Sequence, residues 1–199
     1  FSGTLEAARE LQNGQTYLGG IAGDFSSTVL GTETNISNGD FEGITNCVNK
    51  GTIKITKGSD SARSAGGIAG MNSARITGCI NEGVIEAKPS EETAEEMGSA
   101  PLSLGGIAGN VVIAAAIGED GVISDCENKG TVTADSANAG GIAGSVDLAD
   151  PRYTVTIENC SNTGKVFSEN HYYAGIAADI GVKADTTLTI QNCINETDF

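Results

Sequence analysis

The sequence predicts an all-β protein, a right-handed parallel β-helix of about five coils with about 34 residues in each coil. Three observations support this fold. A short segment containing one cysteine and one asparagine recurs five times, a glycine-rich segment recurs out of phase with it, and the composition favours strands and turns. Together they describe one structural unit that is repeated along the chain.

The first repeated segment contains all five cysteines of the chain. Its copies read ITNCVNKGTI from 44, ITGCINEGVI from 76, ISDCENKGTV from 123, IENCSNTGKV from 157 and IQNCINETDF from 190. An asparagine follows each cysteine two residues later, which gives the pairs Cys47 and Asn49, Cys79 and Asn81, Cys126 and Asn128, Cys160 and Asn162, and Cys193 and Asn195. A fixed place in every copy indicates a structural constraint that every coil shares.

The second repeated segment is rich in glycine. It reads LGGIAG (18–23), AGGIAG (65–70), LGGIAG (104–109), AGGIAG (139–144) and YAGIAA (173–178). The two segments define five repeats over residues 18–199, within a single β-helix domain of residues 1–199. Residues 1–17 are expected to hold the end of a preceding coil, since Gly3–Ala7 matches Gly83–Ala87, and the whole is expected to be part of a longer array.

The composition agrees with strands and turns. The chain of 199 residues has 28 glycines and no tryptophan. Its β-branched stretches are short, as in strands. Only residues 4–12, a candidate partial cap, and the acidic stretch 90–97 have a helix-like pattern.

Side-chain alternation indicates how one coil is built. Along C-x-N-x-G-x-V the repeated residues fall on alternate positions, so an extended chain directs them to one face. Turn-forming residues precede each cysteine and predict a corner there; they are Asn46, Gly78, Asp125, Asn159 and Asn192. We expect three strands in each unit, with GGIAG as one strand whose outward positions are glycine and alanine. A propeller blade would need hairpin signals, which the units do not have.

Stacked coils predict one column of cysteines in the core and one column of asparagines at a bend. A buried cysteine packs as a small apolar side chain, and asparagine amides can bond to one another. Disulfides between some coils remain an alternative, although stacked Cβ atoms about 4.8 Å apart exceed the usual disulfide distance. Metal binding is disfavoured because the cysteines are 32 to 47 residues apart and the chain has one histidine.

Both repeated segments resemble the GLUG-type repeats of large bacterial surface proteins, among them adhesins and the non-catalytic regions of surface peptidases. The resemblance rests on GGIAG and I-x-N-C-x-N-x-G-x-V, and it covers residues 18–199. It implies a secreted β-helix at the bacterial cell surface, joined to further domains of a longer protein, without catalytic residues. The fifth unit departs from the pattern at Ala174, Ala178 and Thr197.

Enzymatic chemistry has weak support in the sequence. The alternative function is a β-helical polysaccharide lyase or glycoside hydrolase, which would need carboxylates stacked on adjacent coils. The expected outward positions show no such column, and His171 lies in a polar segment typical of a loop. No cofactor is predicted; calcium remains an open alternative at Asp147, Asp150 and the run 91–96.

The expected function is that of a non-enzymatic adhesin module, either a rigid spacer or a ligand-presenting surface. The net charge of −15 disfavours nucleic acid and membrane insertion as partners, which leaves a host glycan or a surface protein. The candidate ligand-binding residues are Tyr153, Phe167, His171, Tyr172 and Tyr173, where the aromatic residues gather. The alternative is that Tyr172 and Tyr173 only cover the corner of the last coil.

Overall fold

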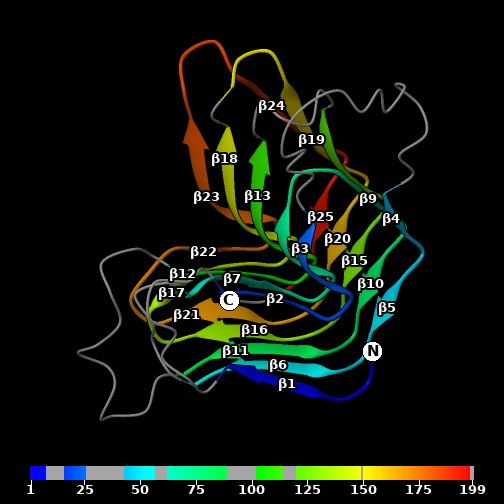
Figure 1. The fold of residues 1–199 in the computed structure, drawn as a ribbon, viewed down its shortest axis with the longest axis vertical. Coiled ribbons are helices and arrows are strands. Elements are labelled where there is room, and N and C mark those ends of the chain that lie inside the picture. Colours follow the sequence, from blue (N-terminus) through cyan, green and yellow to red (C-terminus); the bar gives the residue numbers. More distant parts are fainter. Residues whose placement is uncertain are drawn as a thin grey trace, which may run out of the picture.

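The computed structural model describes residues 1–7, 16–25, 43–56, 62–88, 102–113, 120–148 and 150–197. All regular secondary structure in these segments is β-strand, arranged in five parallel sheets of five strands each. The chain passes through the sheets in the same order in every coil, so the all-β parallel β-helix of about five coils is confirmed (Figure 1).

Sheets A, B and C each contain one strand from every coil. Sheet A consists of β1 (Thr4–Ala7), β6 (Thr52–Ile55), β11 (Val84–Ala87), β16 (Val132–Ala134) and β21 (Val166–Ser168). Sheet B consists of β2 (Thr16–Gly19), β7 (Ala62–Gly66), β12 (Leu102–Gly105), β17 (Ala137–Gly140) and β22 (Tyr173–Ala174). Sheet C consists of β3 (Ala22–Phe25), β8 (Ala69–Asn72), β13 (Ala108–Ile113), β18 (Ala143–Leu148) and β23 (Ala177–Val182).

The two remaining sheets complete each coil. Sheet D consists of β4 (Ile44–Thr45), β9 (Arg75–Thr77), β14 (Gly121–Ser124), β19 (Thr154–Glu158) and β24 (Thr187–Gln191). Sheet E consists of the two-residue strands β5 (Val48–Asn49), β10 (Ile80–Asn81), β15 (Glu127–Asn128), β20 (Ser161–Asn162) and β25 (Ile194–Asn195). Equivalent residues of successive repeats lie side by side; for example, Ile53 pairs with Ile85, and Ile85 with Val132.

The expectation of three strands per unit is wrong, because each full coil has five. GGIAG is a corner between sheets B and C rather than a strand. A β carbon added to Gly66 would lie 2.0 Å from the carbonyl oxygen of Ala69, so only glycine allows the chain to turn this tightly. The alanines of this segment do not face outward either, since Ala69, Ala108 and Ala143 are fully buried.

The corner predicted before each cysteine is confirmed. Its residues adopt the left-handed backbone conformation, with φ between 53° and 64° at Asn46, Gly78, Asp125, Asn159 and Asn192. Asparagine, aspartate and glycine tolerate this conformation best. The helix-like pattern of 4–12 is misleading over its first four residues, which form β1 in register with β6; residues 8–12 and 90–97 lie outside the described residues.

Two hydrophobic clusters fill two arms that form an L in Figure 1. Sheets A and B enclose one cluster, which includes Ile53, Ile85 and Leu104. Sheets C and D enclose the other, which includes Ile76 and Ile107. The GGIAG corner and sheet E meet where the two arms join, and this is where the asparagines lie.

Candidate functional site

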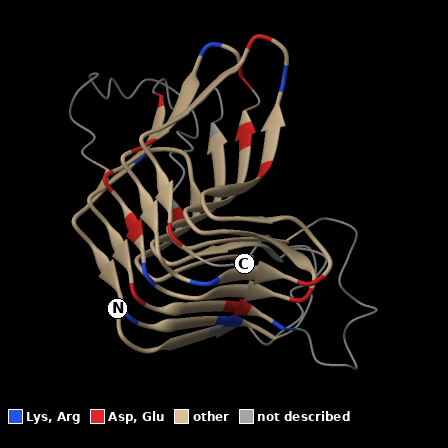
Figure 2. Cartoon of the chain, turned by 180° about the vertical axis from the view of Figure 1, so that it is seen from behind, with Lys and Arg blue, Asp and Glu red and all other residues tan. Residues whose placement is uncertain are grey.

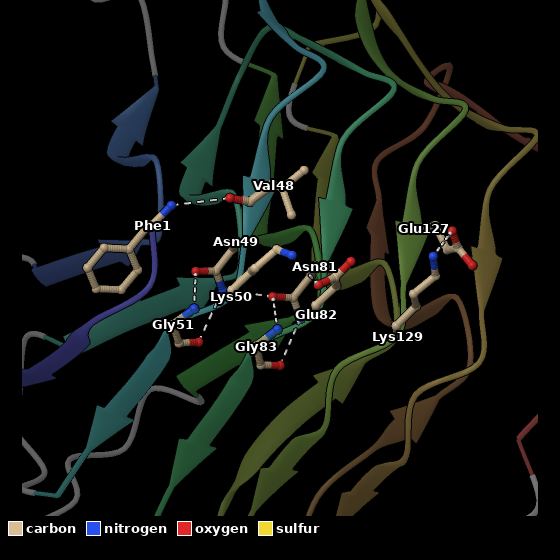
Figure 3. A network of polar contacts seen from close by, with 10 residues as sticks. All are labelled: Phe1, Val48, Asn49, Lys50, Gly51, Asn81, Glu82, Gly83, Glu127 and Lys129. Atoms are coloured by element: carbon tan, nitrogen blue, oxygen red, sulfur yellow. Dashed lines mark hydrogen bonds and ion pairs between the residues drawn. The ribbon is translucent and has the colours of Figure 1, made fainter.

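The five repeated asparagines form a continuous hydrogen-bonded ladder along the coils. The Nδ2 of Asn49 donates to the Oδ1 of Asn81 at 2.7 Å, and the same bond, at the same length, joins Asn81 to Asn128, Asn128 to Asn162, and Asn162 to Asn195. Every amide in the ladder therefore points in the same direction. Figure 3 shows its first two members with their neighbours.

Each asparagine of the ladder also bonds to the chain two residues later. Asn49 accepts a hydrogen bond at 3.0 Å from the backbone N–H of Gly51 and donates from Nδ2 to the carbonyl oxygen of Gly51. Asn81 bonds to Gly83 in the same two ways. These bonds hold the bend between sheets E and A and satisfy backbone groups that a corner would otherwise leave unpaired. The asparagines thus have a structural role.

The five cysteines form a second column, and all five are free thiols. Cys79, Cys126 and Cys160 are buried, whereas Cys47 and Cys193 at the two ends are partly exposed. Each thiol lies near a backbone carbonyl, for example Cys126 Sγ at 3.1 Å from the carbonyl oxygen of Ser124. Hydrogen bonding to Cys160 and Cys79 and burial raise the pKa of Cys126, and burial raises the pKa of Cys47 and of Cys193.

The structure divides the aromatic candidates into two places. The rings of Phe167 and Tyr173 lie 5.7 Å apart, at the end of sheet A and the start of β22, and Tyr172 and His171 are exposed beside them. Phe167 is 44% exposed, so it points outward as the alternation predicts. Tyr153 lies elsewhere, between β18 and β19, where it packs against the cluster of sheets C and D and contacts Arg152.

The carboxylates do not form a column on the outer face of sheet A. Lys54, Glu86, Thr133 and Phe167 follow one another there in register. Lys54 Nζ lies 2.8 Å from Glu86 Oε1, so the two charges form an ion pair. Among the described residues no three His, Cys, Asp or Glu side chains are placed to hold a metal ion.

Asp150, one of the acidic residues predicted as possible calcium ligands, is already bound to Arg152. Its carboxylate accepts three hydrogen bonds from the Arg152 guanidinium, the shortest 2.6 Å, and these bonds lower the pKa of Asp150 to about 2. The run 91–96 lies outside the described residues. Asp147 remains, exposed on β18.

The sequence reasoning missed a line of polar side chains between sheets B and C, which we call the polar seam. It consists of Ser64, Ser103 and Asn138 from sheet B and Asn110, Ser145 and Asp179 from sheet C. The sheet B residues are at most 4% exposed although they face away from both hydrophobic clusters. A signal exists in the sequence. The sheet B residues stand two before the GG of the second, third and fourth repeats, and the sheet C residues directly follow the GIAG or GIAA of the third, fourth and fifth.

Comparisons with protein-family models, curated proteins and solved structures find no match to this chain. In the part of the chain that the structure describes, no helix is long and apolar enough to cross a membrane.

Proposed function

We propose that this chain is a non-enzymatic module of a bacterial cell-surface adhesin, a rigid β-helix that spaces or presents a ligand-binding surface. The asparagine ladder is the observation that carries the proposal. Four successive 2.7 Å bonds join every full coil to the next, so neighbouring coils cannot shift without breaking a buried hydrogen bond. Such a solenoid keeps a fixed length and a fixed direction, which a spacer requires.

The outer faces support presentation rather than catalysis. The repeated cysteines, asparagines and glycines lie in the interior and at the corners. The residue types at outward positions differ from coil to coil. In sheet E, for example, Val48, Ile80, Glu127, Ser161 and Ile194 occupy the same position. A surface that varies on a fixed scaffold suits recognition. Phe167, Tyr172 and Tyr173 offer exposed ring faces on which a sugar or a peptide side chain could stack.

The experiment is binding of the purified chain to a broad glycan panel, together with an assay for cleavage of the same polysaccharides. We expect no cleavage. Specific binding that is lost in Phe167→Ala and in Tyr172→Ala, but kept in Tyr153→Ala, would identify a ligand-presenting surface at the aromatic residues. A folded chain that binds nothing would identify a spacer. Polysaccharide cleavage by the wild-type chain would overturn the proposal in favour of a β-helical enzyme.

A further inference from the structure

The hydrophobic cluster between sheets C and D is uncovered at the last coil. Ile190 is 41% exposed, although Ile157, its counterpart in the preceding coil, is fully buried. Ile180 and Val182 are also exposed, whereas their partners in β18 are buried. At the other end of the same sheet D column, Ile44 is only 8% exposed. The C-terminal end of this cluster presents an apolar end face, which consists of Ile180, Val182, Leu188 and Ile190.

The strands that carry the apolar end face are β23 and β24, the last strands of sheets C and D. They have six and five residues, whereas the last strands of sheets A, B and E have two or three. The outer edge of such a strand presents backbone N–H and C=O groups for pairing, and lysine, proline or a bulge usually protects it. The sequence of β24, TLTIQ, has no charge and no proline. These two edges are therefore suited to pair with another strand.

The pattern of β24 matches its own reverse. Leu188 and Ile190 are the inward positions on either side of outward Thr189, since they pair with the buried residues Val155 and Ile157. When a second β24 runs antiparallel about Thr189, Leu188 of each copy lies opposite Ile190 of the other. Apolar residues then meet apolar residues, and each strand keeps its inward face. A surface that matches itself in this way is what a two-fold symmetric dimer requires.

One two-fold axis can serve β23 as well. Gly181 of β23 and Thr189 of β24 each stand four positions from Asp185, one before it and one after it, in the two strands that flank the same connection. Antiparallel pairing about Gly181 sets Ile180 of each copy opposite Val182 of the other. The space beside Gly181 allows a close approach, because a β carbon there would lie 3.7 Å from its nearest atom.

The charges agree with this register. Pairing about Gly181 brings Asp179 of one copy opposite Lys183 of the other, and opposite charges across two strands attract. Figure 2 shows the acidic segment on β23 and a basic segment in the connection that follows it. Lys183 is exposed and forms no ion pair within the described residues. Asp179 accepts a hydrogen bond from Asn138, and a carboxylate can accept several more.

The N-terminal end of a second copy does not fit these edges. At that end of sheet D, β4 has two residues against the five of β24. In sheet C, stacking in register would place Asp24 of the second copy beside Asp179, because the two residues end the same column. Like charges in that position repel each other. In sheet E the backbone N–H of Lys50 already donates to the carbonyl oxygen of Phe1 at 2.7 Å.

We propose that two copies of this chain form a closed dimer through the apolar end face, with β23 and β24 each running antiparallel to their counterparts. Sheets C and D then continue from one copy into the other, and the two clusters join into one core. Burial of the four apolar side chains from each copy is the main driving force. Because the contact is two-fold symmetric, the assembly stops at two chains. The inference goes beyond the adhesin proposal and does not depend on it.

The test is sedimentation velocity of the purified 199-residue chain over a range of concentrations. We expect a monomer–dimer equilibrium whose limiting mass is twice that of one chain. Val182→Glu should weaken the dimer by at least about tenfold, because it places a charge in the shared core. Ile194→Glu is the matched control: Ile194 is as exposed as Val182, at 57%, and belongs to the same coil, but it lies in sheet E outside the apolar end face. This variant should dimerise like the wild type, and circular dichroism checks that both variants fold.

A cross-link tests the register. Gly181→Cys places one thiol from each copy at the two-fold axis, so oxidation with diamide should join the two copies by a disulfide. The product is a band of doubled mass in non-reducing electrophoresis, and the wild-type chain with its five cysteines gives the background. Four outcomes would each overturn the proposal: a monomer at every concentration, oligomers that grow beyond two chains, equal weakening by Ile194→Glu, or no cross-link above the wild-type background.

Discussion

The Nδ2 of Asn81 donates a 2.7 Å hydrogen bond to the Oδ1 of Asn128, although the two residues are 47 positions apart in the sequence. The neighbouring ladder bonds span 32 to 34 positions and have the same length. The coil that contains the long segment 89–101 therefore returns to the same register as the others. The ladder defines where each coil begins to turn, whatever the length of chain between corners.

Removing one amide from the middle of the ladder should destabilise the whole fold. Asn128→Ala takes away the acceptor of Asn81 Nδ2 and the donor to Asn162 Oδ1, and both groups are buried. We expect the free energy of unfolding to fall by about 3 kcal/mol, from one lost bond and one orphaned group on each side. Urea denaturation followed by circular dichroism measures this change.

The control for this substitution is Asn170→Ala. Asn170 is exposed, and its Nδ2 donates to the carbonyl oxygen of Asp135 at 2.9 Å. Its loss should cost less than about 1 kcal/mol, since water can replace the bond. Equal denaturation midpoints for the two variants would show that the ladder contributes no special stability.

The second glycine of GGIAG should tolerate no side chain. A β carbon at Gly106 would lie 2.1 Å from the carbonyl oxygen of Gly141 and 2.4 Å from Asn128 Cγ. Gly106→Ala must therefore push the corner away from the ladder, and we expect insoluble expression or a loss of more than about 3 kcal/mol. Gly181→Ala is the matched control, because its nearest atom would be 3.7 Å away. Similar Tm values for both variants would contradict the close packing of the corner.

The buried thiol of Cys126 should make stability depend on alkaline pH. Its pKa is raised in the folded state, so in alkaline solution the folded chain holds a proton that the unfolded chain has lost. The contribution is fully present below the unfolded thiol pKa of about 8.5 and is lost as the pH rises above it, by up to about 1.4 kcal/mol per pH unit.

Comparison with Cys126→Ala tests this contribution together with the thiols it contacts, because hydrogen bonding to Cys126 lowers the pKa of Cys79 and of Cys160. Urea denaturation at pH 7 and at pH 10 should show that the wild-type chain loses more stability than Cys126→Ala. A folded-state reaction with a thiol reagent gives a second readout, in which the end residues Cys47 and Cys193 should react before Cys126, because they are partly exposed. An identical pH dependence of the two chains would contradict the raised pKa.

The sequence by itself determined the repeat, the parallel stacking and the corner before each cysteine. These features depend on which residue types recur at fixed spacing, and the left-handed conformation of Asp125 is a local preference that a turn-forming residue reveals. It also placed the cysteines and asparagines in columns, because one repeat per coil brings equivalent residues together. The function of the chain, its location and the hand of the coil stay predictions.

Only the tertiary structure decided that each coil has five strands and an L-shaped cross-section. The GGIAG segment has the alternation of a strand, yet it becomes a corner because Gly109 can pack against the backbone of Ala65 in the preceding coil, where a β carbon would lie 2.6 Å from its nitrogen. Asn138 in sheet B likewise contacts Asp179 in sheet C of the next coil. The positions of the seam residues next to the glycine-rich segment can be read from the sequence. Their burial, and the contact of Asn138 with Asp179, depend on how sheets B and C of different coils pack, so only the fold revealed them.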